Sequence, residues 1–127
     1  MIVVLDTCAL LWITLDPERL SEDARKLYAE AELRLVCSIS IWEIGIKWKN
    51  GRLNLGTSFD DYFELLNNCH EFSISPIDAS LWARSLRLPW DHRDPSDRLI
   101  VALAQTHQAY ILTSDARMKR YYERCIS

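Results

Sequence analysis

Five acidic residues of this sequence stand where they could share a metal ion. They are widely separated along the chain, as Asp6, Glu43, Asp94, Asp97 and Asp115. Carboxylate oxygens are hard ligands, so a group of them favours Mg²⁺ or Mn²⁺ over zinc or copper. Carboxylates that meet at one place repel one another, and such a cluster normally requires a cation. What chemistry these acids can do therefore depends on whether the fold brings them together.

Short apolar runs alternate with helical patterns along the chain. The runs are rich in Val, Ile and Leu and predict four buried strands, at Ile2–Leu5, Leu33–Ser38, Ser73–Ile77 and Ala109–Thr113. Apolar residues at helical spacing predict helices that open at Ser21, Ser58, Asp78 and Ser96. Strands separated by helices predict an α/β fold, a three-layer α/β/α sandwich around a parallel sheet of four to five strands. A chain of 127 residues has the length of one domain, which we expect to span residues 1–127.

The acids fall close to the ends of the predicted strands. Ligands of parallel α/β sheets bind outside the carboxyl ends of the strands. Asp6 directly follows the first strand, Glu43 follows the second in the first turn of the next helix, and Asp115 follows the fourth. Asp94 and Asp97 open the helix before the fourth strand. We therefore expect all five carboxylates to project toward one edge of the sheet.

Each acid also fits a purely structural role. Asp6 and Asp115 can cap the helices that they precede. The stretch Ser40–Glu43 fits a capping box, and Asp94–Asp97 has an acid at the N-cap, proline at the first helical position and an acid two residues later. The sequence by itself supports capping and a shared metal site equally.

Composition excludes several other classes of protein. Fifteen Lys and Arg against 18 Asp and Glu give a net charge of -3, which excludes a basic arm that binds nucleic acid by charge alone. Three glycines form no phosphate-binding loop, and four cysteines form no Cys-x-x-Cys pair for zinc. Cys8 and Cys37 lie in apolar runs, where free cysteine is expected to be buried. Without a signal or membrane segment, we expect a cytoplasmic protein.

Four separated stretches resemble the PIN-domain nucleases, and among them the VapC-type toxins of bacterial toxin–antitoxin pairs. The stretches occur in the family's order, as Ile2–Thr7, Ser40–Lys47, Leu88–Pro89 with His92–Leu99, and Leu112–Asp115. The resemblance implies the same three-layer fold and a Mg²⁺- or Mn²⁺-dependent ribonuclease that cleaves single-stranded or loop RNA. It also implies a homodimer and a cognate antitoxin that silences the toxin.

The resemblance assigns roles to particular residues. Carried over by motif, the acidic quartet of the family is Asp6, Glu43, Asp97 and Asp115. Thr7 and Thr113 match positions where the family often keeps a hydroxyl near the metal, and Asp94 matches a capping or supporting acid. The sequence departs from the family pattern at two places. Cys8 stands where relatives often carry a polar residue. Only a few residues follow Tyr122, so the last strand of the family is expected to be minimal or missing.

The expected mechanism places one or two ions among these acids, held chiefly by Asp6 and Asp97 and completed by Asp115 and Glu43. An ion held there would lower the pKa of a bound water molecule that attacks an RNA phosphodiester, so no histidine base is required. Lys47, Arg93 and Arg98 are candidate contacts to RNA phosphates, although Lys47 is equally suited to an i,i+4 pairing with Glu43. His92 is expected at the surface and Trp82 in the core.

Two other kinds of protein share parts of this pattern, a phosphatase and a non-catalytic adaptor. A phosphatase of the haloacid-dehalogenase type also has an aspartate after its first strand, but it requires a second aspartate where this chain has Cys8. A non-catalytic adaptor on the same fold is the remaining alternative. The presence of all four acids of the quartet argues against the adaptor.

Overall fold

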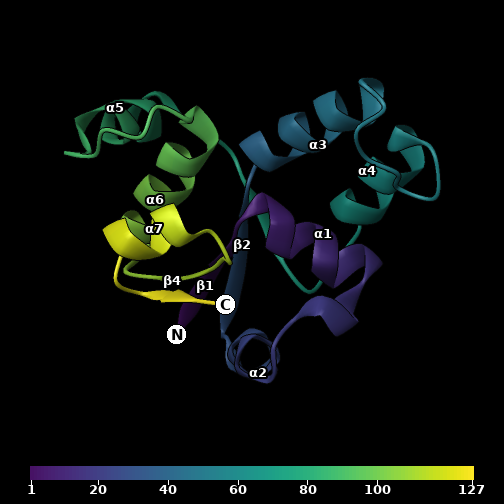
Figure 1. The fold of residues 1–127 in the computed structure, drawn as a ribbon, viewed down its shortest axis with the longest axis horizontal. Coiled ribbons are helices and arrows are strands. Elements are labelled where there is room, and N and C mark those ends of the chain that lie inside the picture. The colour runs from purple at the N-terminus through teal and green to yellow at the C-terminus, as the bar shows by residue number, and fades with distance from the viewer.

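The structure, a computed structural model, describes residues 1–127 as a parallel sheet between two layers of helices (Figure 1). The sheet has five strands in the order β3-β2-β1-β4-β5, and every neighbouring pair is parallel. The strands are β1 (Ile2–Leu5), β2 (Leu33–Cys37), β3 (Ser73–Ser75), β4 (Tyr110–Leu112) and β5 (Cys125–Ile126). The predicted α/β/α fold is confirmed, and the last strand forms but is only two residues long.

Seven helices and one 3-10 turn connect the strands. They are α1 (Thr7–Leu15), η1 (Pro17–Arg19), α2 (Glu22–Glu30), α3 (Ile39–Lys49), α4 (Phe59–Asn67), α5 (Ala79–Arg87), α6 (Pro95–His107) and α7 (Ala116–Tyr121). Ser21, Ser58 and Asp78 are the N-caps of α2, α4 and α5, as the sequence predicts, and each side chain accepts a hydrogen bond from a backbone N–H of the first turn.

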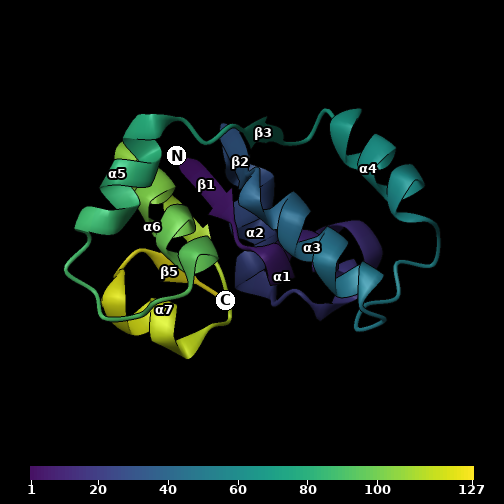
Figure 2. The ribbon, with the colours of Figure 1, turned by 90° about the horizontal axis from the view of Figure 1, so that it is seen from above.

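The two faces of the sheet are covered by different helices. In β1, Val3 and Leu5 pack into a cluster with residues of α1 to α4, whereas Val4 packs into a second cluster with residues of α5, α6 and α7. This alternation follows from the two-residue period of a strand. Seen from above, α3 and α4 lie on one side of the sheet and α5 and α6 on the other (Figure 2). The sheet is therefore buried on both faces, and ligands can reach it only at its ends and edges.

Arg98 fixes the segment between α5 and α6. Its guanidinium donates hydrogen bonds to the carbonyls of Ser85 (2.9 Å), Leu88 (2.8 Å) and His92 (3.0 Å), and also to that of Trp90. A planar guanidinium with five N–H donors suits such a set of carbonyls. Arg98 is thereby committed to holding the loop that enters α6.

Two expectations about burial are wrong. Trp82 keeps 43% of its surface exposed on α5, because its side of the helix faces solvent rather than the sheet. Cys8 is exposed as well, because Thr7 and Ala9 on either side of it are the residues that α1 buries. None of the helices has the length and apolar character needed to cross a membrane.

The burial of α6 leads to a test of this core. Leu99 on α6 is fully buried, whereas Leu86 on the neighbouring α5 is 78% exposed. Leu99→Ala is expected to lower the free energy of unfolding by about 2–5 kcal/mol, since a cavity adds to the lost burial. Leu86→Ala is expected to change it by less than ~0.5 kcal/mol. Urea unfolding measures both, and equal losses would contradict this placement of α6.

Candidate metal centre

The structure brings all five acids to one hollow at the carboxyl ends of the strands. The hollow has a volume of about 300 Å³ and is lined by Asp6, Thr7, Cys8, Glu43, Lys47, Asp94, Asp97, Ser114 and Asp115. Its acids come from the ends of β1 and β4, from α3 and from the start of α6. The central position of β1 in the sheet, between β2 and β4, explains why residues so distant in sequence meet there.

Asp6 and Asp115 are held as helix caps. Asp6 Oδ1 accepts a hydrogen bond of 2.7 Å from the backbone N–H of Ala9, and Asp115 Oδ1 accepts one of 2.8 Å from that of Arg117. Thr113 lies beside both acids, since its side chain acts to lower the pKa of Asp6 and its hydroxyl accepts the backbone N–H of Asp115 at 3.0 Å. Capping thus fixes the direction of both carboxyl groups.

Glu43 is held by hydroxyl groups from two other elements. Its Oε1 accepts hydrogen bonds from Thr7 (2.5 Å) and from Ser96. Because the single proton of Thr7 is donated to Glu43, Ser40 must donate to Thr7 across their 2.8 Å contact. The expected capping box is therefore wrong: α3 begins at Ile39, Glu43 lies in its second turn, and the Ser40 hydroxyl is used in this network.

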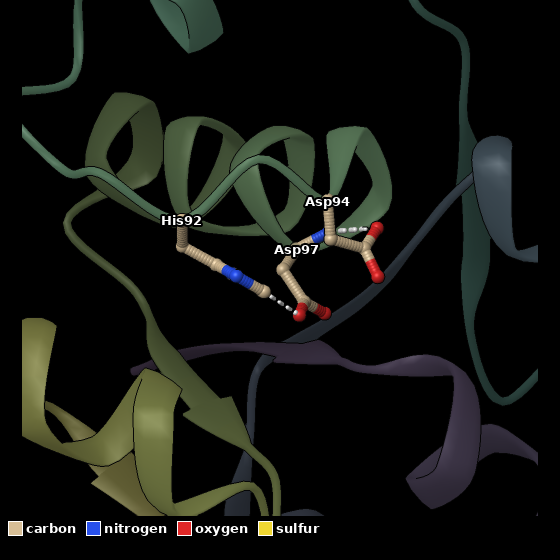
Figure 3. Close-up of side chains that lie close together, drawn as sticks. All are labelled: His92, Asp94 and Asp97. Carbon is tan, nitrogen blue, oxygen red and sulfur yellow. Dashed lines mark hydrogen bonds and ion pairs between the residues drawn. The ribbon is translucent and has the colours of Figure 1, made fainter.

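Asp97 is positioned by His92, which the sequence did not single out for this role. The His92 side chain is only 9% exposed, so the expectation of a surface histidine is wrong. Its Nε2 lies 2.6 Å from Asp97 Oδ2 and its Nδ1 lies 2.9 Å from Arg117 Nη1. Arginine can only donate, so Nδ1 accepts and Nε2–H donates to the carboxylate. Figure 3 shows the imidazole directed at Asp97 from the segment before α6.

His92 consequently positions the Asp97 carboxylate and does not act as a metal ligand in this arrangement. The ligand atoms of His92, Asp94 and Asp97 lie within 4.8 Å of one another, which is close enough for a shared ion. However, a ring nitrogen that carries a proton for Asp97 has no lone pair to offer. The Trp90 ring, 4.8 Å from the imidazole, packs against His92 and further restricts it.

The capping and metal-binding interpretations of the acids are compatible. Asp97, Asp115 and Glu43 each use one carboxylate oxygen in the bonds described above, and the second oxygen of each forms no hydrogen bond with the protein. Asp94 likewise accepts the N–H groups of Ser96 and Asp97 through Oδ1 alone. One oxygen thus fixes each side chain and the other is available to a cation in the hollow.

The hollow is deficient in positive charge. Burial, with the charges of Asp97 and Asp115 adding to it, raises the pKa of Asp6 to about 6, although the Thr113 side chain and the backbone N–H of Ala9 act to lower it. Burial also raises the pKa of Asp97, again with nearby acids contributing. Lys47 is the sole basic residue in the lining, and it forms no ion pair with Glu43. This donor set fits a hard divalent cation, whose charge would relieve the repulsion.

The expected RNA-contacting residues lie in different places. Lys47 lines the acidic hollow itself. Arg93 lines an adjoining hollow with His92, Asp94 and Arg117. Arg98 is in neither, because its donors are used on backbone carbonyls. The sequence also did not predict the roles of Ser40, Ser96 and Arg117 in holding the site. These roles depend on contacts with residues 25 to 53 positions away, which no local sequence pattern indicates.

The electrostatics of Asp6 lead to a test on metal-free protein. A carboxyl whose pKa rises from 3.8 to about 6 on folding destabilises the protein most above pH 6, and the penalty fades as pH falls through 6 toward 3.8. Asparagine keeps the cap but not the charge. Asp6→Asn is therefore expected to raise the free energy of unfolding at pH 7.5, in chelator, by about 2–3 kcal/mol, and by much less near pH 4.5.

A matched substitution controls for the cap. Asp78→Asn changes the exposed cap of α5 in the same way and should leave stability within ~0.5 kcal/mol at both pH values. Chemical denaturation in chelator measures the change in the free energy of unfolding for both variants at both pH values. An Asp6→Asn protein no more stable than the parent at pH 7.5 would contradict the electrostatic account.

Known proteins share this architecture and its sequence signature. Residues 3–124 match the PIN domain family. The curated protein "Ribonuclease VapC22" of Mycobacterium tuberculosis is 29% identical over 121 residues, which cover 94% of this chain and 91% of that protein.

Solved structures show the same fold at low sequence identity. A toxin–antitoxin complex from Klebsiella pneumoniae has a TM-score of 0.67 at 19% identity, with 98% of this chain and 96% of the other covered. VapBC2 from Rickettsia felis, bound to a DNA fragment from its promoter, has a TM-score of 0.67 at 16% identity and coverages of 100% and 98%. VapC20 of Mycobacterium tuberculosis, a sarcin–ricin loop cleaving toxin, has a TM-score of 0.64 at 13% identity, with 93% of each chain covered.

The family match spans almost the whole chain, including every acid of the hollow. With the parallel sheet and the acidic hollow at its carboxyl ends, it shows that this chain belongs to the PIN domain family.

Proposed function

We propose that this protein is a Mg²⁺- or Mn²⁺-dependent endoribonuclease that cleaves single-stranded or loop RNA and acts as the toxin of a toxin–antitoxin pair. The observation that carries the proposal is the set of carboxylates that are tied by one oxygen and open at the other. The ribonuclease name of the VapC22 relative and the toxin–antitoxin neighbours support the same function.

The four acids would divide the work of holding one or two divalent ions. Asp6 and Asp97 would be the central ligands, because their charges already interact across the hollow. Asp115 and Glu43 would complete the set through Oδ2 and Oε2, while Thr7, Thr113 and Asp94 keep the geometry fixed. When bound, a divalent ion would lower the pKa of a water molecule and stabilise the negative charge that develops on the phosphodiester.

The residues around the acids would handle the RNA strand. Lys47 extends from α3 into the lining of the hollow and could donate to a phosphate oxygen there. Arg93 lies at the adjoining hollow and is exposed. Arg98 has no such role, since it holds the loop that carries His92. In the reaction, a water oxygen bonds to phosphorus, the ester oxygen leaves, and a proton passes to solvent while another reaches the leaving oxygen.

We also propose a homodimer and a cognate antitoxin as partners, and the cytoplasm as the place of action. Trp42, 64% exposed, and Ile46 lie one turn apart on α3 and form an apolar strip of the kind that protein interfaces use. All four cysteines are free, which suits a reducing compartment.

Substitution of the acids tests catalysis. Asp97→Asn keeps the size and polarity of the side chain but removes the charge, and it is expected to lower RNA cleavage at saturating Mg²⁺ at least about 1000-fold, since the metal supplies several kcal/mol. Asp6→Asn should act likewise, and Asp78→Asn should cleave as the parent does. Cleavage of several RNA classes is followed with Mg²⁺, Mn²⁺ or chelator, together with calorimetry of Mn²⁺ binding.

Two results would overturn this assignment. Cleavage by Asp97→Asn at the parental rate would remove the metal site from these residues. Failure of the parent protein to cut any RNA class with either metal, despite correct folding, would favour a non-catalytic adaptor.

Genetic context tests the toxin role. We expect expression of the chain alone to arrest growth of a bacterial host, and co-expression with a small adjacent gene to restore it. Asp97→Asn should be harmless while still binding the product of that gene in a pull-down. Growth arrest by Asp97→Asn equal to that by the parent would contradict toxicity through RNA cleavage.

A further inference from the structure

A second hollow, unlike the acidic one, lies where α5, the end of α6 and α7 meet. It has a volume of about 730 Å³ and shares no residue with the acidic hollow. Four of its nine lining residues are basic and one is acidic, and the nine are Arg84, Gln105, Gln108, Lys119, Arg120, Tyr121, Tyr122, Glu123 and Arg124. We refer to it as the basic hollow.

The positive charge continues beyond this hollow. An adjoining hollow shares Arg84 and adds Arg87 and His107, with Asp78 as its acid. Together the two hollows carry five Lys or Arg side chains against two acids, in a chain whose net charge is -3. This part of the surface therefore has a local excess of positive charge, although the chain as a whole is acidic.

Internal contacts account for only part of this charge. Arg124 donates to the carbonyl of Gln108 at 2.7 Å, where α6 ends, and Lys119 donates to Ser127 Oγ at 2.5 Å. Arg84 and Arg120, by contrast, form no hydrogen bond or ion pair with the rest of the protein. Two exposed guanidinium groups thus face the same hollow from α5 and from α7 with their donors unused.

The position of α7 connects the basic hollow to the acidic one. At its start, Asp115 lines the acidic hollow, and Arg117 lines the hollow beside it together with Arg93. Lys119 and Arg120, further along the same helix, line the basic hollow. Since α7 has six residues, it is about 9 Å long, a distance that a few nucleotides of RNA span.

The chemistry of the lining favours a phosphodiester backbone over an acidic peptide. Guanidinium groups match phosphate oxygens in pairs of parallel hydrogen bonds. A docked peptide would need an apolar pocket for an anchoring side chain, but the only apolar lining here is from Tyr121 and Tyr122. Tyr121 is already stacked on Trp90, with ring centroids 4.5 Å apart, and the Tyr122 hydroxyl donates to the Ala109 carbonyl.

We propose that the basic hollow binds the phosphate backbone of the RNA strand a few nucleotides away from the bond that is cut, with Arg84 and Arg120 as its principal contacts. This inference rests on the proposed ribonuclease function and adds a second RNA-binding site to it. Its contribution is to affinity, since neither arginine reaches the acids that would act on the scissile phosphate.

The test combines Arg84→Gln with Arg120→Gln in the full chain. In chelator, which prevents cleavage, the double variant is expected to bind a fluorescent ~15-nucleotide single-stranded RNA roughly tenfold more weakly than the parent. The slope of log affinity against log salt should fall by about 1.4, the value for two lost contacts to a single strand. With Mg²⁺, KM for a long RNA should rise while kcat stays unchanged.

The matched control removes two charges elsewhere. Arg25→Gln with Lys26→Gln on the exposed surface of α2 is expected to bind and cleave as the parent does. If the double variant binds RNA as tightly as this control, the proposal is overturned. It is also overturned if a polyglutamate peptide, and not RNA, loses affinity in the double variant.

The two proposals fail in different ways. Absence of RNA cleavage by the parent with either metal would refute the ribonuclease, whatever the basic hollow binds. Cleavage by the parent together with unchanged RNA affinity in the double variant would refute only the basic hollow.

Discussion

The acidic hollow depends on a division of labour between the two oxygens of each carboxylate. Asp6, Asp94 and Asp115 accept backbone N–H groups at the starts of α1, α6 and α7, where unpaired donors and the helix dipole favour negative charge. These interactions offset part of the repulsion among the acids that meet in the hollow. They do not remove the repulsion, because burial and the neighbouring charges still raise the pKa of Asp6 to about 6. The remaining oxygens are therefore free to bind a cation in the hollow that these residues line.

The topology of the sheet brings these helix starts together. The helices α1 and α7 follow β1 and β4, which are parallel and adjacent, so both begin at the same end of the sheet. The helix α6 follows α5 rather than a strand, and it reaches the same place by packing on β1 and β4. Glu43 is the exception, since it comes from the second turn of α3 and caps nothing. It is held instead by the hydroxyls of Thr7 and Ser96, so its position depends on how α3 packs against α1 and α6. The site is thus a product of tertiary packing as much as of strand order.

The sequence predicted what depends on local pattern. The strand Ile2–Leu5 and the helix caps Ser21, Ser58 and Asp78 agree with the structure because turn chemistry and apolar periodicity are read over a few residues. The capping box at Ser40 failed because α3 already begins at Ile39, and the Ser40 hydroxyl instead bonds to Thr7, 33 residues away. The prediction of a surface position for His92 is likewise wrong, because its two ring nitrogens bond to Asp97 and to Arg117, which lies 25 residues away.

The distribution of charge reconciles an acidic chain with the proposed RNA substrate. A net charge of -3 gives little general attraction for RNA, which suits the proposed ribonuclease if it is to bind only some strands. Near the acids, positive charge comes from Lys47 in the acidic hollow, from Arg93 and Arg117 beside it and from the basic hollow past α7. The contacts from Arg117 through His92 to Asp97 connect α7 to the acids, so the helix that carries Arg120 is fixed relative to the acidic hollow. A strand held at both places would therefore be aligned across the hollow rather than merely attracted to it.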